Sequence, residues 1–117
     1  MDSVDLPGCC PRAELGIAVV GRSSDAVTVA VRGEIDMDNG EHLRHVLLGV
    51  LEAVPKVLCV DMSGVTFLGS VGLRVLVECH TTAQDRARQL VLEDVREWER
   101  RVIAMAGLDE LFEFRGS

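Results

Sequence analysis

The sequence predicts one α/β domain, built as a mixed β-sheet with helices packed on it, and three observations lead to this fold class. The chain has 117 residues, a length that fits one domain. Apolar residues make up 48% of it and few residues are aromatic, so the core consists mainly of Val, Leu and Ile. Strand-like and helix-like apolar periods alternate in the order β-β-α-β-α-β-α-β, which requires crossover connections and a largely parallel or mixed sheet.

The first two predicted strands form a β-hairpin. Residues 15–20 are an apolar run, and residues 22–25 (Arg-Ser-Ser-Asp) offer turn-forming side chains. In residues 26–31, valines alternate with Thr28 and Ala30, which is the two-residue period of a strand. Two such runs joined by a short turn are typical of a hairpin.

The first helix is predicted between two recognisable ends. Asp38 lies three residues before Glu41, the spacing of an N-cap residue and its reciprocal partner. Pro55 disfavours helical geometry at the residue before it and ends the helix. Between these ends the apolar residues form one stripe: Leu43, Val46, Leu47, Val50, Leu51 and Val54.

The third strand and the second helix follow. Residues 57–60 are continuously apolar, as expected at the middle of a sheet that is covered on both faces. Residues 61–69 contain two glycines and are predicted as a loop. A second helix is predicted over residues 71–87. Its first half is apolar nearly all round, so it is either buried or holds one face for a partner.

The last predicted elements are a strand over residues 90–92, a third helix and an edge strand over residues 112–114. Asp94 lies three residues before Glu97 and repeats the capping spacing at the start of the helix. Gly107 is predicted to end that helix in the left-handed conformation.

Charge and composition exclude two classes of partner. The net charge is -7 and Lys56 is the one lysine, whereas nucleic-acid-binding proteins collect Lys and Arg to displace phosphate counterions. No apolar run approaches the roughly 20 residues that a membrane-spanning helix needs. We therefore expect no nucleic acid and no membrane as partner, and the oligomeric state stays open.

Residues 1–14 contain two prolines and no apolar period, so we expect a flexible leader, followed by a folded domain over residues 15–117. Asp2 and Asp5 stand where a secretory signal would carry positive charge. This favours a cytoplasmic protein.

The four cysteines are expected to be reduced thiols. Cys59 and Cys79 fall inside regular elements, where a cysteine packs as a small hydrophobe. Cys79 and the histidine after it point in different directions on a helix and do not form a catalytic dyad. The adjacent Cys9 and Cys10 are either a redox switch or incidental, and the second interpretation is preferred.

Other titratable residues have simpler explanations than catalysis or metal binding. His42 and His45 are three apart on a helix, but no matching ligand set is evident, so they are interpreted as surface residues. The acidic stretch at residues 34–41 is interpreted as solvated charge beside a helix N-terminus, or as part of a docking surface. Asp61 is expected to fix its loop by accepting a bond from a nearby backbone N–H. We expect no catalytic site, metal or cofactor.

Two segments carry a resemblance to a known family. Residues 33–36 read Gly-Glu-Ile-Asp, and residues 61–73 read Asp-Met-Ser-Gly-Val-Thr-Phe-Leu-Gly-Ser-Val-Gly-Leu. They resemble the signature stretches of the STAS-domain anti-sigma factor antagonists, Gly-Glu-(Leu/Ile)-Asp and Asp-Leu-Ser-x-Val-x-Phe-(hydrophobic)-Asp-Ser-Ser-Gly-Leu. Residues 107–112 also resemble the close of that family. The resemblance covers roughly residues 15–115.

The resemblance implies a STAS-like fold and a function in binding rather than catalysis. Members dock on an anti-sigma factor, commonly a histidine-kinase-like ATPase that acts as a serine kinase, and docking releases a sigma factor. The kinase can silence the antagonist by phosphorylating a serine at the start of the second helix. The alternative is a STAS-domain scaffold or regulatory subunit with another protein partner and no phosphorylation switch.

The residues expected to bind the partner lie on both motifs and on the two segments that follow them. They are Glu34, Asp36, Asp38, Ser63, Gly64, Leu68, Gly69, Ser70, Val71, Gly72, Arg74 and Val75.

The second motif departs from the family pattern at its end. Gly69 stands where Asp is usual, and Val71 stands on the serine that is the usual phosphoacceptor. Ser70 matches the serine before it and has three interpretations. It caps the second helix, or it replaces the missing phosphoacceptor, or binding is constitutive because Val71 makes an apolar contact that cannot be switched off.

Overall fold

The computed structural model describes residues 15–54 and 56–116. The elements follow in the order β1 (Gly16–Arg22), β2 (Ala26–Ile35), α1 (Gly40–Ala53), β3 (Val57–Leu68), α2 (Ser70–Asp85), β4 (Gln89–Glu93), α3 (Glu97–Met105) and β5 (Glu113–Arg115). This confirms the predicted α/β class and element order. The expected leader over residues 1–14, with Cys9 and Cys10, lies outside the described residues.

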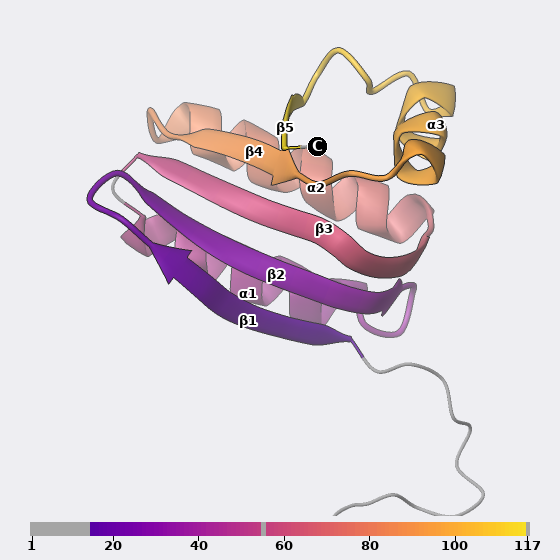
Figure 1. The fold of residues 1–117 in the computed structure, drawn as a ribbon, viewed down its shortest axis with the longest axis horizontal. Coiled ribbons are helices and arrows are strands. Elements are labelled where there is room, and N and C mark those ends of the chain that lie inside the picture. Colours follow the sequence, from indigo (N-terminus) through magenta and orange to yellow (C-terminus); the bar gives the residue numbers. More distant parts are fainter. Residues whose placement is uncertain (1–14, 55, 117) are drawn as a thin grey trace, which may run out of the picture.

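The five strands form one mixed sheet in the order β1-β2-β3-β4-β5. β1 and β2 pair antiparallel as the predicted hairpin, and β2, β3, β4 and β5 pair parallel. α1 and α2 lie together on one face of the sheet, and α3 lies at the end of the sheet where β4 stops (Figure 1). None of the described helices is long and apolar enough to cross a membrane.

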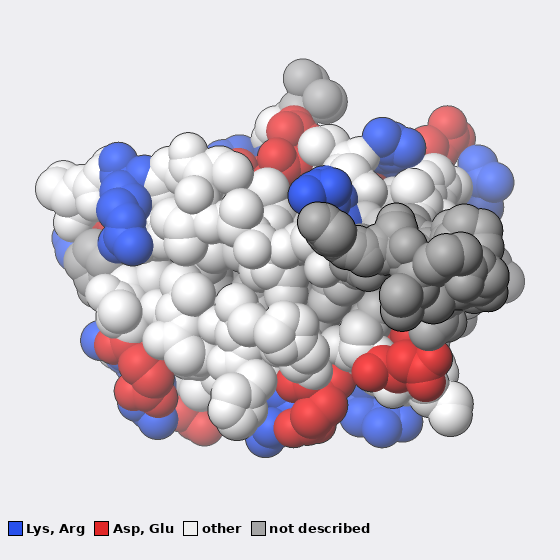
Figure 2. Space-filling model, turned by 90° about the horizontal axis from the view of Figure 1, so that it is seen from below, with Lys and Arg blue, Asp and Glu red and all other residues white. Residues whose placement is uncertain are grey.

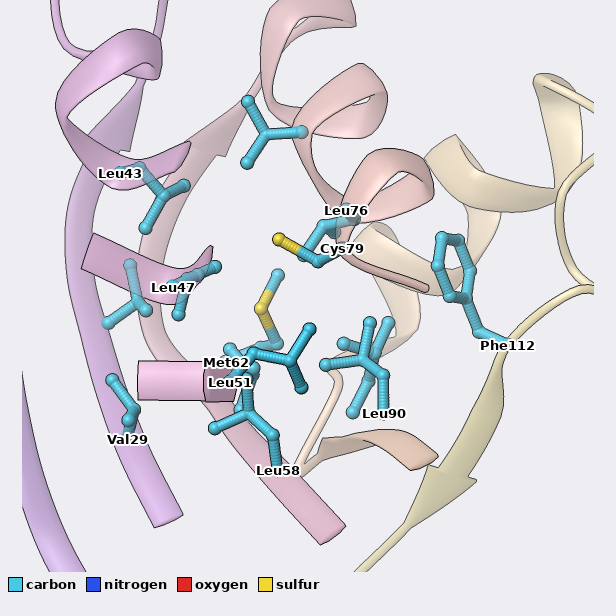
Figure 3. Packing of buried hydrophobic residues seen from close by; sticks show 14 of the residues in the cluster. Val29, Leu43, Leu47, Leu51, Leu58, Met62, Leu76, Cys79, Leu90 and Phe112 are labelled. Carbon is cyan, nitrogen blue, oxygen red and sulfur yellow. The ribbon is translucent and has the colours of Figure 1, made fainter. Parts of the chain in front are cut away.

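The core lies between this sheet and the two long helices (Figure 3). Alternate residues of β2 and one stripe of α1 supply part of it, which confirms both predicted periods. The larger fully buried side chains include Val29, Leu43, Leu47, Leu51, Leu58, Met62 and Leu76. Cys79 is a free thiol that packs in this core, as predicted.

β3 is longer than predicted, because residues 61–68 are strand and not loop. The pairing of β3 with β2 is irregular at two places, between the partners of Ala30 and Arg32 and between those of Gly33 and Glu34. At each place β3 holds one residue more than β2, which is the count of a β-bulge. The Ser-Gly pair at residues 63–64 lies at the first irregularity, so turn-like residues occur inside a strand.

The predictions of Asp38 and Asp94 as N-cap residues are also wrong. α1 is preceded by Asn39 and not by Asp38, and α3 is preceded by Arg96 and not by Asp94. Asp94 instead adopts a positive φ of 53° in the turn before α3. The predicted end of α3 is confirmed, because Gly107 has a φ of 77°.

Candidate functional site

The two motifs lie side by side at the end of the sheet. β2 and β3 run parallel, so Ile35 at the end of β2 is the register partner of Leu68 at the end of β3. The N–H of Gly69 donates a hydrogen bond to the Ile35 carbonyl oxygen over 3.3 Å. The segment that leads into α1 and the segment that leads into α2 therefore lie next to each other at the same end of the sheet.

The start of α2 is exposed and carries no side-chain cap. Gly69 is the N-cap residue, with φ -95° and ψ -174°, and Ser70 is the first residue of the helix. The prediction that Ser70 caps α2 is therefore wrong. Ser70 is exposed, and no acidic side chain lies in the first turn. The first N–H groups and the positive end of the helix dipole are left without an acceptor from the helix itself.

Val71 is half-buried, because its side chain packs against the start of α1. A Cβ built on Gly40 would overlap the Val71 Cγ1 atom. Gly72 is equally enclosed, since a Cβ there would lie 2.7 Å from both Ile35 Cγ2 and Leu68 Cδ1. Two glycines thus allow the starts of α1 and α2 to approach each other and the sheet closely.

The loop between β2 and α1 is held by side-chain hydrogen bonds. Asn39 Oδ1 accepts from the Asp36 N–H over 2.9 Å, and Asn39 Nδ2 donates to the Glu34 carbonyl oxygen over 2.7 Å. Asp36 Oδ1 accepts from the Asp38 N–H over 2.9 Å. Asn39 was not among the expected site residues, although an asparagine directly before a glycine is a turn signal. The acidic loop is consequently built in a defined shape.

The expected partner-binding residues differ in exposure. Asp38, Gly64, Ser70 and Arg74 are exposed, and Glu34, Asp36, Ser63, Gly69 and Val71 are half-buried. Leu68, Gly72 and Val75 are buried in the domain itself, with the two larger side chains each 4% exposed. The side chains of Leu68 and Val75 therefore pack within the domain and shape the site from inside. Phe67, which is 49% exposed beside Gly69, was missed.

The remaining candidates that fall within residues 15–54 and 56–116 do not come together as a metal or nucleophile site. His42 and His45 are exposed, and within the described ranges no group of three His, Cys, Asp or Glu side chains could hold a metal ion. Burial raises the pKa of the Cys79 thiol to about 12, which keeps it protonated and unreactive. Asp61 Oδ1 accepts from the Ser63 N–H over 2.9 Å, so the predicted bond to a nearby backbone N–H is confirmed, although it lies within β3 and not in a loop.

Comparisons with known proteins agree with this geometry. A family model described as "Mlab, STAS domain" matches residues 18–113. The "Anti-sigma-B factor antagonist" of Listeria monocytogenes is 27% identical over 103 residues, covering 86% of this chain and 89% of the relative. The crystal structure of an anti-sigma factor antagonist from Mycobacterium paratuberculosis is 30% identical, with a TM-score of 0.71, covering 86% of this chain and 85% of the other.

A further structure, of the anti-sigma factor antagonist SpoIIAA in its unphosphorylated form, has a TM-score of 0.72 at 14% identity. It covers 87% of this chain and 88% of that one, and it supports the fold alone. The family model spans most of the described chain and meets both motifs. The chain belongs to the STAS-domain family and is similar to its anti-sigma factor antagonists.

Proposed function

We propose that this protein is an anti-sigma factor antagonist, which binds an anti-sigma factor and so frees a sigma factor to direct bacterial transcription. The observation that carries the proposal is the start of α2. There Ser70 is exposed, the helix N-terminus has no cap, and the family motif leads directly into it. The proposal makes the protein a cytoplasmic binding module, without a reaction of its own.

The geometry suits docking by a rigid surface. The side chains that shape the site from within are buried, and the adjacent loop is fixed by Asn39. A surface that is already ordered loses little conformational entropy when a partner binds. The N–H groups at the start of α2 supply hydrogen-bond donors for an acceptor on the partner. Arg74, one turn further along, adds an exposed positive charge.

The proposed partner is a histidine-kinase-like ATPase that acts as a serine kinase, and Ser70 is the candidate phosphoacceptor. A phosphate at Ser70 would stand at a helix N-terminus, where N–H groups and the helix dipole stabilise it. It would also bring about two negative charges into a surface that presents a neutral hydroxyl. Phosphorylation would therefore weaken docking without unfolding the domain.

One observation favours a second candidate function, a STAS-domain scaffold or regulatory subunit that has no phosphorylation switch. Val71 occupies the usual acceptor position, and its side chain is engaged with Gly40. In this second function the protein uses the same surface, and binding is constitutive.

The test is affinity capture from native cell extract with purified wild type and Ser70→Glu, followed by mass spectrometry of the recovered proteins. The glutamate mimics phosphate charge at an exposed position and favours the helix N-terminus, so the fold is kept. We expect wild type to recover an anti-sigma factor and Ser70→Glu to recover at least about tenfold less, a loss of about 1.4 kcal/mol of binding free energy.

Thr81→Glu is the matched control, because Thr81 is exposed on the same helix far from its start. It is expected to recover the partner as wild type does. Equal recovery by Ser70→Glu would show that the start of α2 is not the docking site. Incubation with the recovered kinase and ATP then separates the two functions: a mass increase that Ser70→Ala abolishes supports the switch, and no increase supports constitutive binding.

A further inference from the structure

The outer edge of β1 is an unprotected strand edge. β1 stands first in the sheet, and no strand within the described ranges pairs with its outer side. It carries no charge from Gly16 to Gly21, and Val19 and Val20 are 44% and 60% exposed. Edge strands of monomers are usually guarded by charged residues or proline, because unpaired backbone groups invite another strand. In the described part of the chain, the irregular pairing near Val20 is the one such feature along residues 16–21 of β1.

The flank of α1 on the same side is also neutral. The charged side of α1 faces α2, where Arg44 Nη2 lies 2.8 Å from Glu78 Oε2 and Glu52 pairs with Arg86. The helical period places Val46, Val50 and Ala53 on the opposite side of α1. These residues have no charge, and they turn toward the β1 edge. Gly49, next to them, is exposed, and a Cβ on it would meet no atom within 4 Å.

Together the two elements make one uncharged surface, which we call the β1–α1 face: Ile17, Val19, Val46, Gly49, Val50 and Ala53. Figure 2 looks onto this side of the molecule and shows a broad neutral area, with the charged side chains gathered at its rim. A chain with a net charge of -7 repels its copies over most orientations. Two copies that approach each other through the β1–α1 face meet uncharged surface.

We propose that the β1–α1 face binds a second copy of this chain, in a two-fold dimer that pairs the two β1 strands antiparallel. A two-fold axis at Ala18 places Ile17 of one copy opposite Val19 of the other. Both residues lie on the helix-covered face of the sheet, because their partners on β2 are the buried Val31 and Val29. The sheets then join into one, and the face of each copy covers the same face of the other.

The shape of the face favours a second copy over an extended peptide. A peptide added to β1 would satisfy the strand edge but would leave the flank of α1 in water. A two-fold partner brings its own α1 alongside, antiparallel, so that the two helix dipoles oppose favourably. The open space over Gly49 lets the two helices come close. The start of α2 lies beyond the opposite flank of α1, so this inference does not depend on the proposed function.

The experiment is sedimentation equilibrium of the full chain over a concentration range of about 1 μM to 1 mM. We expect a monomer–dimer equilibrium with twice the monomer mass at the upper end. Val19→Lys puts a charge on the strand edge, and Gly49→Arg puts bulk and charge on the α1 flank, at a position where an added Cβ has nothing within 4 Å. Each variant is expected to weaken the dimer at least about tenfold.

Ala104→Arg is the control, because it adds the same charge at an exposed position of α3, away from β1. It is expected to leave the equilibrium unchanged. Circular dichroism of each variant checks that the fold is kept. A monomer at all concentrations overturns the proposal. A dimer that survives both Val19→Lys and Gly49→Arg overturns it as well, since the copies then meet through another surface.

Discussion

The first turn of any helix has unpaired N–H groups and the positive end of the helix dipole. The starts of α2 and α3 differ in how these are satisfied. α3 carries two acidic residues in its first turn, and Glu99 Oε1 accepts from the Arg96 N–H over 2.7 Å. Glu99 is fully buried, so this N-terminus is satisfied from inside the domain. α2 begins at Gly69, without a side-chain cap and without an acid in its first turn. The first residue of this helix, Ser70, is exposed.

The two helix ends therefore differ in kind: the start of α3 is satisfied within the domain, and the start of α2 carries no side-chain cap. The inward solution at α3 has a cost, because Glu99 Oε2 is buried without a hydrogen-bond partner among the described residues. Burial therefore raises the pKa of Glu99 to about 7, with the nearby Asp61 carboxylate adding to the effect. The start of α2 gives up a capping bond, and its first N–H groups have no acceptor from the helix itself.

The largest expected effect concerns the pH dependence of stability. The pKa of Glu99 is raised from 4.5 when unfolded to about 7 when folded, so the folded state holds a proton that the unfolded state releases. The stability from protonated Glu99 is fully present below pH 4.5 and is lost as the pH rises through about 7. We expect urea unfolding to report a loss of about 2–3 kcal/mol between pH 5 and pH 8, and Glu99→Gln to remove most of it.

Glu97→Gln is the control for that slope, because Glu97 lies in the same first turn but is exposed and pairs with Arg101. Its pH profile is expected to follow wild type. An unchanged slope in Glu99→Gln would mean that α3 does not start on a buried protonated carboxyl group, and the contrast with α2 would be lost.

A smaller effect is expected at the contact that holds the start of α2 against α1. Gly40→Ala adds a methyl group that overlaps Val71 Cγ1, and overpacking of this kind costs about 1–3 kcal/mol of unfolding free energy. Val71→Ala in the same chain is expected to recover part of the loss. Thermal unfolding of the two single variants and the double variant measures the coupling.

Gly49→Ala is the matched control in the same helix, since its added Cβ meets nothing. It is expected to raise the unfolding free energy by about 0.5–1 kcal/mol, because alanine favours a helix interior. Equal effects of Gly40→Ala and Gly49→Ala would refute a close contact between the starts of α1 and α2.

The smallest effect is expected from giving α2 the kind of cap it lacks. Gly69→Asp should stabilise the domain by about 0.5–1 kcal/mol, through a side-chain bond to the first turn and the interaction with the helix dipole. The half-exposed Phe67 ring, 3.1 Å from the added Cβ, has room to move. Gly69→Asn supplies the acceptor without the charge, so the salt dependence of the difference isolates the dipole. A destabilised Gly69→Asp would indicate that this N-terminus is not open.

The sequence predicted the element order because the spacing of apolar residues along a strand or helix follows from which side chains face the core. The hairpin, the α1 stripe and the left-handed Gly107 all follow from such local signals. The end of β3 could not be predicted in this way, because bulges admit Ser63 and Gly64 into a strand. The capping pattern at Asp38 failed because Asn39 forms two hydrogen bonds to the backbone and is itself the N-cap residue, so the helix starts one residue later than predicted.

The motif predicted where the candidate site lies, but it did not predict which of its residues are buried and which are exposed. A motif gives residues in order along the chain, and Leu68, Gly72 and Val75 appeared in it beside the exposed Ser70. Which of them point inward depends on how far α2 stands from β2 and α1, a distance between segments remote in sequence. The packing of Val71 on Gly40 is of the same kind.

The contact between Gly40 and Val71 also limits which substitutions these two positions tolerate. A Cβ added at Gly40 would overlap Val71 Cγ1, so a larger residue at position 40 requires a smaller one at position 71. A serine introduced at position 71 would restore a hydroxyl where the relatives' motif has one, and it would leave a gap above Gly40. Filling that gap would take a second substitution at position 40, in a different helix from the hydroxyl.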